Sequence, residues 1–223
     1  MQRKTGNETS KMYKKIQPFL RGKGIDIGCG PWPLDYPNLD TLDIAPEVNS
    51  TILARAEKIP MPNETYDFVY SSHCLEHVKC PKKVLKEWIR ILKPGGLLIL
   101  ILPHKYFYHN VRDKKGNASH WYDFRPEDVI LMLRQIKQTY LIETGILVEQ
   151  VVPRWQGKIE YSLRKEFNQY SFYMVACKKK CFESFFIESW LNKFSKIKPA
   201  LKNKLKILCQ KIFPFGKNAY VLL

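Results

Sequence analysis

Two glycines one residue apart, Gly28 and Gly30, end a short apolar stretch, and an acid, Asp26, stands just before them. A buried parallel strand ends in this way when its backbone must approach a ligand closely, because glycine has no Cβ in the path and tolerates a left-handed backbone. The Asp26 carboxylate can face a cationic or amine-bearing part of that ligand. A glycine pair by itself remains a weak signal, because ordinary turns also use glycine.

A second acid, Asp43, closes the next apolar stretch of the chain. An acid at the end of the second strand, roughly 20 residues beyond a glycine turn, is placed to accept hydrogen bonds from ribose hydroxyls. The alternative is a solvated aspartate at a strand end, of which Asp40 is a nearby example. Together with the glycine turn, Asp43 favours a ligand that contains a nucleoside.

The histidines are confined to residues 73–120, the part of the chain that should form the rim above this ligand. Histidine titrates near neutral pH and can take a proton from a hydroxyl group. His104 follows an apolar strand and His120 lies in an aromatic segment, so we predict that these two act in catalysis. A hydrogen-bonding structural histidine is the alternative for each, and it is the preferred interpretation of His77. Because no Cys/His ligand spacing is present, the sequence predicts no metal site.

Aromatic residues accompany both candidate catalytic histidines. Their rings could stack on a sugar ring, or they could pack together as a lid over the site. The sequence leaves both alternatives open for Tyr106, Phe107, Tyr108, Trp121 and Tyr122.

The elements that must position these residues alternate between strands and connections, which indicates an α/β sheet. The prolines of residues 31–37 leave no room for a full helix between the first two strands. The expected helices cover residues 11–20, 81–92 and 126–137. The expected strands cover residues 23–28, 39–44, 51–53, 66–71, 97–102, 141–152 and 171–177, with an insertion at 103–125 and a long connection at 153–170.

Several short motifs succeed one another at sensible spacing: Asp26-x-Gly28-x-Gly30, Asp43, Ala56-Glu57-Lys58-Ile59-Pro60, Tyr66-Asp67-Phe68-Val69, Leu75-Glu76-His77-Val78 and Leu92-Lys93-Pro94-Gly95-Gly96. This succession resembles a class I S-adenosylmethionine-dependent methyltransferase of the methyltransferase-11 type. The resemblance is close over about residues 22–104 and extends in outline to about residue 178. The short proline-rich turn after Gly30 is similar to that of bacterial-type members associated with surface-polysaccharide biosynthesis.

The resemblance implies a Rossmann-like seven-stranded sheet with an antiparallel last strand, and S-adenosylmethionine as the cofactor. It also implies that Gly28 and Gly30 approach the cofactor, that Asp26 lies near its methionine amine, and that Asp43 holds its ribose. The further cofactor-binding residues implied by the resemblance are Ala56, Glu57, Ser72 and His73.

One position departs from the family pattern. Members often carry an acid that faces the adenine amine, and here that position is Arg55. Arginine cannot accept a hydrogen bond. Glu57 or a backbone carbonyl must therefore take this role, or the adenine is bound more loosely, and another nucleoside stays possible.

The expected reaction is methyl transfer from a sulfonium, in which the leaving group is already good and the enzyme mainly positions the acceptor. A sugar hydroxyl would need a general base or a metal, whereas an amine can attack when neutral. We expect a sugar or a lipid-linked glycan as the acceptor. The net charge of +16 leaves RNA methylation as an alternative. A third hypothesis is a non-catalytic scaffold protein, mildly favoured by Arg55 and opposed by the glycine turn and Asp43.

The positive charge is concentrated near the C-terminus, because residues 178–223 hold eleven lysines and two acids. Apolar residues recur there at helical spacing, and Pro199 should divide the stretch into two helices. Such a basic amphipathic helical extension could lie on an anionic membrane, or it could dock on the domain or on a partner. Nucleic acid is the less favoured partner, because no RNA-binding module is recognisable.

We therefore expect a lead-in at residues 1–22, a methyltransferase domain at 23–178 and a basic amphipathic tail at 179–223. No apolar run has the ~18 residues of a membrane-spanning helix, and the polar start of the chain lacks a signal core. The scattered cysteines suggest reduced thiols. These features predict a cytoplasmic protein, with peripheral contact at the inner membrane face through the tail.

Overall fold

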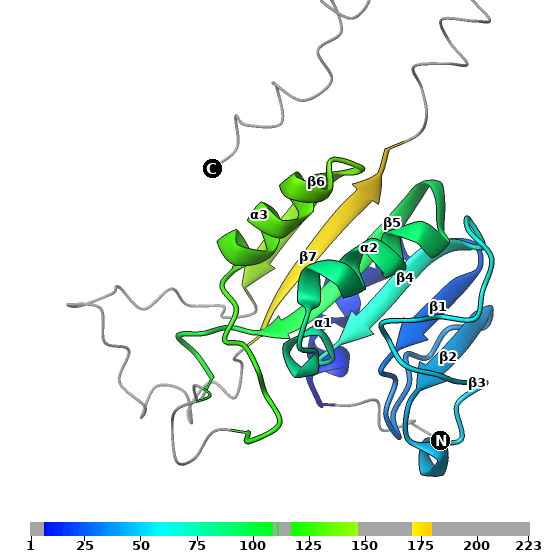
Figure 1. Cartoon of the computed structure of the whole chain (residues 1–223), viewed down its shortest axis with the longest axis horizontal. Helices are drawn as coiled ribbons and strands as arrows, with labels where there is room; N and C mark the ends of the chain where they lie inside the picture. The colour runs from blue at the N-terminus through cyan, green and yellow to red at the C-terminus, as the bar shows by residue number, and fades with distance from the viewer. Residues whose placement is uncertain (1–6, 109–110, 112–116, 147–170, 180–223) are drawn as a thin grey trace, which may run out of the picture. The chain divides into compact units, whose positions relative to one another are not determined.

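The computed structural model describes residues 7–108, 111, 117–146 and 171–179. The chain divides into two units, residues 1–178 and 179–223. One sheet in the first unit has the strand order β3-β2-β1-β4-β5-β7-β6 (Figure 1). Its strands are β1 (Gly24–Ile27), β2 (Leu39–Asp43), β3 (Ile52–Leu53), β4 (Tyr66–Ser72), β5 (Leu92–Pro103), β6 (Thr139–Ile146) and β7 (Ser171–Lys178).

The sheet is parallel except at one edge. β3, β2, β1, β4 and β5 run parallel to one another, and β7 pairs antiparallel with both β5 and β6. The predicted seven-stranded Rossmann-like sheet with an antiparallel last strand is thus confirmed. In such a sheet a ligand binds beyond the carboxyl ends of the parallel strands, where the strand order reverses beside β1.

Helices cover both faces of the sheet. Helix α2 (Pro81–Ile91) begins with a proline, which suits a first turn, and it buries Val84, Leu85 and Trp88 in one core. Helix α3 (Pro126–Ile136) adds Val129 to this core. Helix α1 (Asn7–Ile16) contributes Met12 to a second core, which contains other residues of β4 and β5. The short 3-10 turns are η1 (Gln17–Phe19), η2 (Pro46–Val48) and η3 (Leu75–His77).

A loop without a helix connects β1 to β2, as the prolines predict. The loop folds back on the strand that it leaves, because the backbone N–H of Leu34 donates to Oδ2 of Asp26 at 2.8 Å. The Leu34 side chain is buried with Met12 and Ile16 of α1 in the second core. This loop and α1 therefore cover a face of the sheet close to the glycine turn.

Several element boundaries differ from the sequence-based expectation. β5 begins at Leu92 and not at Leu97, because Leu92 pairs with Tyr66 and the register then shifts so that Leu97 pairs with Phe68. The Lys93–Gly96 segment, expected as a turn, is an irregularity within this strand. α1 covers residues 7–16 and not 11–20, and β6 begins at Thr139 and not at Leu141. The rest of the strand expected at 141–152, the connection at 153–170 and the tail helices lie outside the described residues.

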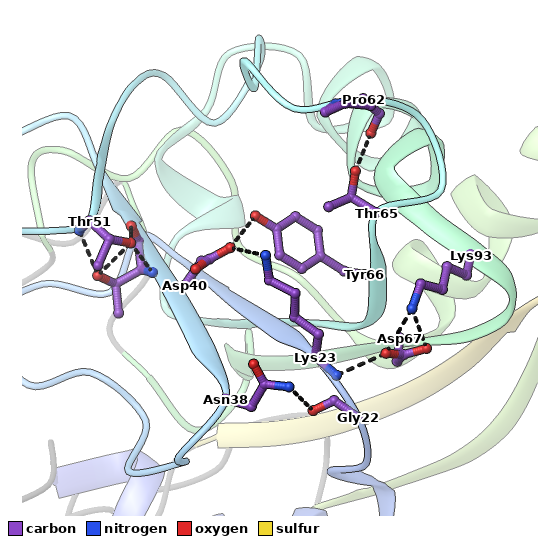
Figure 2. A network of polar contacts seen from close by, with 11 residues as sticks. Gly22, Lys23, Asn38, Asp40, Thr51, Pro62, Thr65, Tyr66, Asp67 and Lys93 are labelled. Atoms are coloured by element: carbon purple, nitrogen blue, oxygen red, sulfur yellow. Dashed lines mark hydrogen bonds and ion pairs between the residues drawn. The ribbon is translucent and has the colours of Figure 1, made fainter.

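A polar network joins the amino ends of the central strands (Figure 2). Oδ2 of Asp67 accepts the backbone N–H of Lys23 at 2.8 Å, and Nζ of Lys93 lies 2.9 Å from Oδ1. The hydrogen bond from Lys23, and then those from Lys93, hold the pKa of Asp67 below its usual range. Lys23 also forms an ion pair with Asp40 at 2.9 Å. The network ties β1, β4 and β5 together at the end opposite to the glycine turn.

Within the part of the chain that the structure describes, no helix combines the length and the apolar character that a membrane crossing requires.

Candidate active site

The glycine turn directly follows β1. Gly28 and Gly30 both have left-handed backbones, with φ of 71° and 55°. A Cβ added at Gly28 would lie 2.6 Å from Sγ of Cys74, whereas a Cβ added at Gly30 would meet nothing within 4 Å. Gly28 is therefore needed for packing against the residue before η3. Gly30 faces open space, as a turn that receives a ligand requires.

Asp43 links this turn to the end of β2. Its Oδ2 accepts the backbone N–H of Gly30 at 2.9 Å, and its Oδ1 accepts the N–H of Ala45 at 3.0 Å. Each carboxylate oxygen can accept more than one hydrogen bond. Asp43 can thus hold the glycine turn in place and still accept ribose hydroxyls, which fits the predicted role.

Asp26 is almost completely buried in β1, with 2% of its surface exposed. Burial raises its pKa to about 7, although the hydrogen bond from Leu34 opposes this shift, and the charge of Asp43 adds to it. A nearby cation would favour the charged carboxylate and lower the pKa again. The site therefore fits the ammonium group of a methionine moiety beside Asp26.

The residues expected around the adenine lie after β3. The Ala56 carbonyl accepts the indole N–H of Trp88 at 3.0 Å, which ties this turn to α2. Oε1 of Glu57 pairs with Arg55 at 3.2 Å, and the arginine side chain is 67% exposed. Arg55 stands at the position where an acid was expected. It pairs with Glu57, the carboxylate that was expected to face the adenine amine in place of that acid. The adenine contacts of Ala56 and Glu57 stay predictions.

Ser72 ends β4, and His73 follows it with a left-handed φ of 53°. The backbone N–H of His73 donates to the carbonyl of Ile101 at 2.9 Å, and its Nε2 lies 3.0 Å from Oγ of Ser171. These bonds anchor the turn after β4 to β5 and β7. The structure thus gives His73 a positioning role, and its contact with the cofactor, like that of Ser72, stays a prediction.

His104 follows β5 and is buried among aromatic rings, with those of Phe107 and Phe172 at 4.6 and 5.9 Å between centroids. Its Nδ1 accepts the backbone N–H of Tyr106 at 3.1 Å. In the neutral ring the proton then resides on Nε2, which makes that atom a donor. This geometry favours His104 as an anchor of the loop after β5. Its role as a general base stays a prediction.

His120 lies in a different cluster, beside Glu76 and His77 of η3. The rings of His77 and His120 are 4.5 Å apart between centroids, and that of Tyr108 is 5.5 Å from His120. Burial lowers the pKa of His120, although the nearby Glu76 opposes the shift. This shift favours the neutral form of His120, which a general base must have. Sequence reasoning missed its partner Glu76, although the Leu75-Glu76-His77 motif was visible.

The aromatic residues near the two histidines differ in their contacts and exposure. Tyr106, Phe107 and Tyr108 pack against the two histidines. Trp121 and Tyr122 are 55% and 38% exposed. Nζ of Lys79 lies 5.0 Å from the centre of the Trp121 ring, and the Tyr122 hydroxyl donates to the Lys79 carbonyl at 2.8 Å. An aromatic rim therefore adjoins His120 in the sequence and stands open to a ligand.

Comparisons with known proteins agree with this geometry. Residues 37–100 match the family described as a methyltransferase domain. Over 131 residues the chain is 29% identical to an uncharacterized protein of Methanocaldococcus jannaschii, covering 52% of this chain and 64% of that protein. Over 120 residues it is 32% identical to the ubiquinone/menaquinone biosynthesis C-methyltransferase of Pasteurella multocida, covering 54% and 43%. The chain thus spans less than two thirds of these relatives.

Solved structures share the fold at low sequence identity. A putative methyltransferase of Haloferax volcanii, in complex with a methyltransferase activator, has a TM-score of 0.56 at 13% identity, covering 78% of this chain and 90% of that one. An S-adenosylmethionine-dependent methyltransferase of Mesorhizobium loti has a TM-score of 0.54 at 14% identity, covering 78% and 100%. These likenesses confirm the predicted fold. The family match supports a class I methyltransferase domain that uses S-adenosylmethionine as its cofactor.

Proposed function

We propose that the protein is an S-adenosylmethionine-dependent methyltransferase that acts on a hydroxyl of a sugar or a lipid-linked glycan. The observation that carries the transferase assignment is the left-handed glycine turn, held by Asp43 and open to a ligand at Gly30. When bound, the cofactor supplies an electrophilic methyl group.

The residues of the chain have separate roles in this proposal. Gly28 and Gly30 let the backbone approach the cofactor, Asp43 accepts its ribose hydroxyls, and Asp26 in its charged form holds its ammonium group. The chain's main contribution is to place the acceptor in line with the methyl group, because the leaving group needs little help.

The acceptor side of the proposal rests on the exposed rings of Trp121 and Tyr122 beside the buried His120. An aromatic face can cover the apolar face of a sugar ring, and a neutral histidine can take a hydroxyl proton. The short loop at residues 31–37 supports, by resemblance, a place in surface-polysaccharide biosynthesis. The name of the Pasteurella relative favours carbon methylation of a quinone precursor as a second candidate, although the match covers only 43% of that protein.

The location and the partners belong to the same proposal. We place the protein in the cytoplasm, with residues 179–223 contacting the inner membrane face, where a lipid-linked acceptor would be reached. The support is the lysine-rich, apolar composition of that stretch. Nucleic acid is the less favoured partner, since the charge excess lies mainly outside the domain that carries the glycine turn.

Calorimetric titration of the full chain with S-adenosylmethionine and with its demethylated product tests the transferase assignment. Binding of both, with loss of affinity in an Asp43→Ala variant, is expected. A chain that binds neither would overturn the proposal and leave a scaffold role. Methyl transfer to glycan, quinol and RNA acceptors, monitored with a labelled methyl group, then separates the acceptor classes.

A further inference from the structure

We propose that Glu76, His77 and His120 form a binding site for one divalent first-row metal ion, such as Zn²⁺ or Mn²⁺. Glu76 and His77 are neighbours on η3, while His120 comes from the segment after β5. One potential ligand atom from each residue lies within 4.8 Å of the others. The inference departs from the sequence-based expectation of no metal, and its catalytic role rests on the proposed methyltransferase function.

Glu76 provides the strongest reason for an ion. Its side chain is 0% exposed, and among the described residues neither carboxylate oxygen accepts a hydrogen bond. Nδ1 of His73 lies 3.4 Å from Oε1. Buried polar atoms in native proteins nearly always have a partner, and an ion or a water at this place would supply it.

His120 points to the same conclusion from the other side of the cluster. Its Nδ1 is buried and has no hydrogen-bond partner in the described part of the chain. The carboxylate of Glu76 and the imidazole of His120 thus both lack a hydrogen-bond partner among the described residues, and both offer a ligand atom within 4.8 Å of His77.

The ring of His77 is oriented by a second layer of contacts. The Ser119 hydroxyl donates to Oδ1 of Asn117 at 2.6 Å, and its oxygen lies 3.0 Å from Nδ1 of His77. Since the single hydroxyl proton is used on Asn117, Nδ1 of His77 must be the donor to Ser119. The lone pair of His77 is then on Nε2, where a metal can take it.

The peptide backbone also fixes the distance between the two segments. The N–H of Trp121 donates to the carbonyl of Glu76 at 2.8 Å. The residue after His120 is thus bonded to the residue that supplies the carboxylate. This hydrogen bond holds the two segments that supply the ligands together.

The site adjoins the glycine turn through Cys74. Gly28 packs directly against the Cys74 side chain, two residues before Glu76. The proposed metal site therefore begins two residues along the chain from a side chain that packs against the glycine turn.

Two imidazoles and one carboxylate are a donor set used by catalytic Zn²⁺, and they leave at least one coordination position open. An acceptor hydroxyl at that position would have a lowered pKa, so the ion would replace His120, now a ligand, as the group that promotes loss of the hydroxyl proton. Its proton passes to water, and its oxygen forms the bond to the methyl carbon. The sulfur–methyl bond breaks at the same time, and its electron pair stays on sulfur, which becomes a neutral thioether.

The test uses the full chain, freed of metal with a chelator and titrated calorimetrically with Zn²⁺ and with Mn²⁺, with Mg²⁺ for comparison. One equivalent of Zn²⁺ or Mn²⁺ should bind. Glu76→Gln and His120→Ala should each weaken binding at least about 100-fold, and Ser119→Ala roughly 10–100-fold through loss of ring orientation. Glu64→Gln, at an exposed carboxylate paired with Lys178, is the matched control and should bind like the unaltered chain.

Cobalt substitution guards against a variant that merely fails to fold. Co²⁺ bound to the unaltered chain should give a visible absorption spectrum that is lost in Glu76→Gln, while far-ultraviolet circular dichroism stays unchanged. Failure of the unaltered chain to bind any of the four ions, or equal binding by Glu76→Gln, would overturn the proposal. Titration of the same metal-free protein with S-adenosylmethionine separates the two proposals, since cofactor binding without metal binding would reject only the metal site.

Discussion

At the scale of single residues, the candidate site depends on carboxylates that the fold has removed from water. Asp26 and Glu76 are buried. Asp43 is partly exposed, and each of its oxygens accepts one backbone N–H. Burial disfavours the charged form of Asp26 and raises its pKa to about 7. An ammonium group beside Asp26 would relieve this penalty, and a metal ion would give the Glu76 oxygens a partner.

Asp43→Ala should weaken S-adenosylmethionine binding about 10-fold or more. A hydrogen bond to a charged group contributes about 1.5–3 kcal/mol, and the substitution also releases the Gly30 N–H from its acceptor. Calorimetric titration measures the affinity, and thermal unfolding shows whether the fold persists. Unchanged affinity in a folded variant would mean that Asp43 does not hold the ribose.

Cofactor affinity should depend on the protonation of Asp26. Its pKa is raised to about 7 in the protein without ligand, and a bound ammonium would lower it. Binding below pH 7 must therefore expel a proton, so the affinity rises with pH up to about 7 and then levels off. Titrations in buffers of different ionisation enthalpy measure the released proton. In Asp26→Asn this dependence should disappear, and its persistence there would assign the proton to another group.

At the scale of elements, the site is built from the segments at the carboxyl ends of the strands. The turn after β1, the end of β2 and η3 after β4 come together because parallel strands present their carboxyl ends at one edge. The network of Lys23, Asp67 and Lys93 ties β1, β4 and β5 together at the opposite ends of the strands (Figure 2). The carboxyl ends of the strands thus form the candidate ligand site, and the network at the amino ends holds the strands in register.

The two glycines of the turn should respond differently to alanine. Gly30→Ala places a Cβ in open space and suffers mainly the left-handed backbone, at a cost of about 1–2 kcal/mol in the free energy of unfolding. Gly28→Ala adds a collision with Cys74 and should lose more stability. Urea unfolding measures the stability loss of each variant. Both variants should bind the cofactor poorly. Equal stability losses would show that Cys74 moves aside readily.

Asp67→Ala should lower the free energy of unfolding by roughly 0.5–1.5 kcal/mol, because the Lys23 N–H loses its acceptor. Asp67→Asn keeps an acceptor and should lose less. The pKa of Asp67 is held low in the folded chain, so its charge contributes stability above the usual carboxyl pKa, and that contribution fades as the pH falls through the lowered value. Urea titrations at pH 7 and pH 3 check this, and a difference between wild type and Asp67→Asn that is constant with pH would contradict it.

At the scale of the whole molecule, the sheet and the lysine-rich stretch fall into separate units. The sheet ends with β7 at Lys178, where the first unit also ends. The second unit carries a large part of the positive charge of the chain. The proposed catalytic and membrane-contact functions can therefore be separated by truncation.

Deleting residues 181–223 should leave a folded domain that binds the cofactor. The full chain should sediment with anionic vesicles at low salt, less at high salt, and not with neutral vesicles, since each lysine near an anionic surface contributes about 1 kcal/mol that salt screens. The truncated chain should stay in solution. Equal sedimentation of both forms would rule out the membrane role, and retention on RNA with a steep salt slope would favour nucleic acid.

The sequence by itself determined the features that neighbouring residues encode. The glycine turn, the helix-free loop at residues 31–37 and the proline start of α2 depend on local backbone preferences, so the order of elements and the position of the glycine turn could be predicted. The start of β5 at Leu92 could not be predicted from the sequence, because it depends on pairing with Tyr66 across the sheet.

Only the tertiary structure decided which groups surround the histidines. His104 and His120 looked alike in the sequence, yet one is an aromatic-packed anchor and the other faces Glu76 and His77. The physical reason is that the partners of His120 lie more than 40 residues earlier in the chain, so only the folded sheet brings them within ligand distance. The burial that leaves the Glu76 oxygens without hydrogen bonds among the described residues is likewise a property of the packed molecule, and it is the feature that indicates an ion.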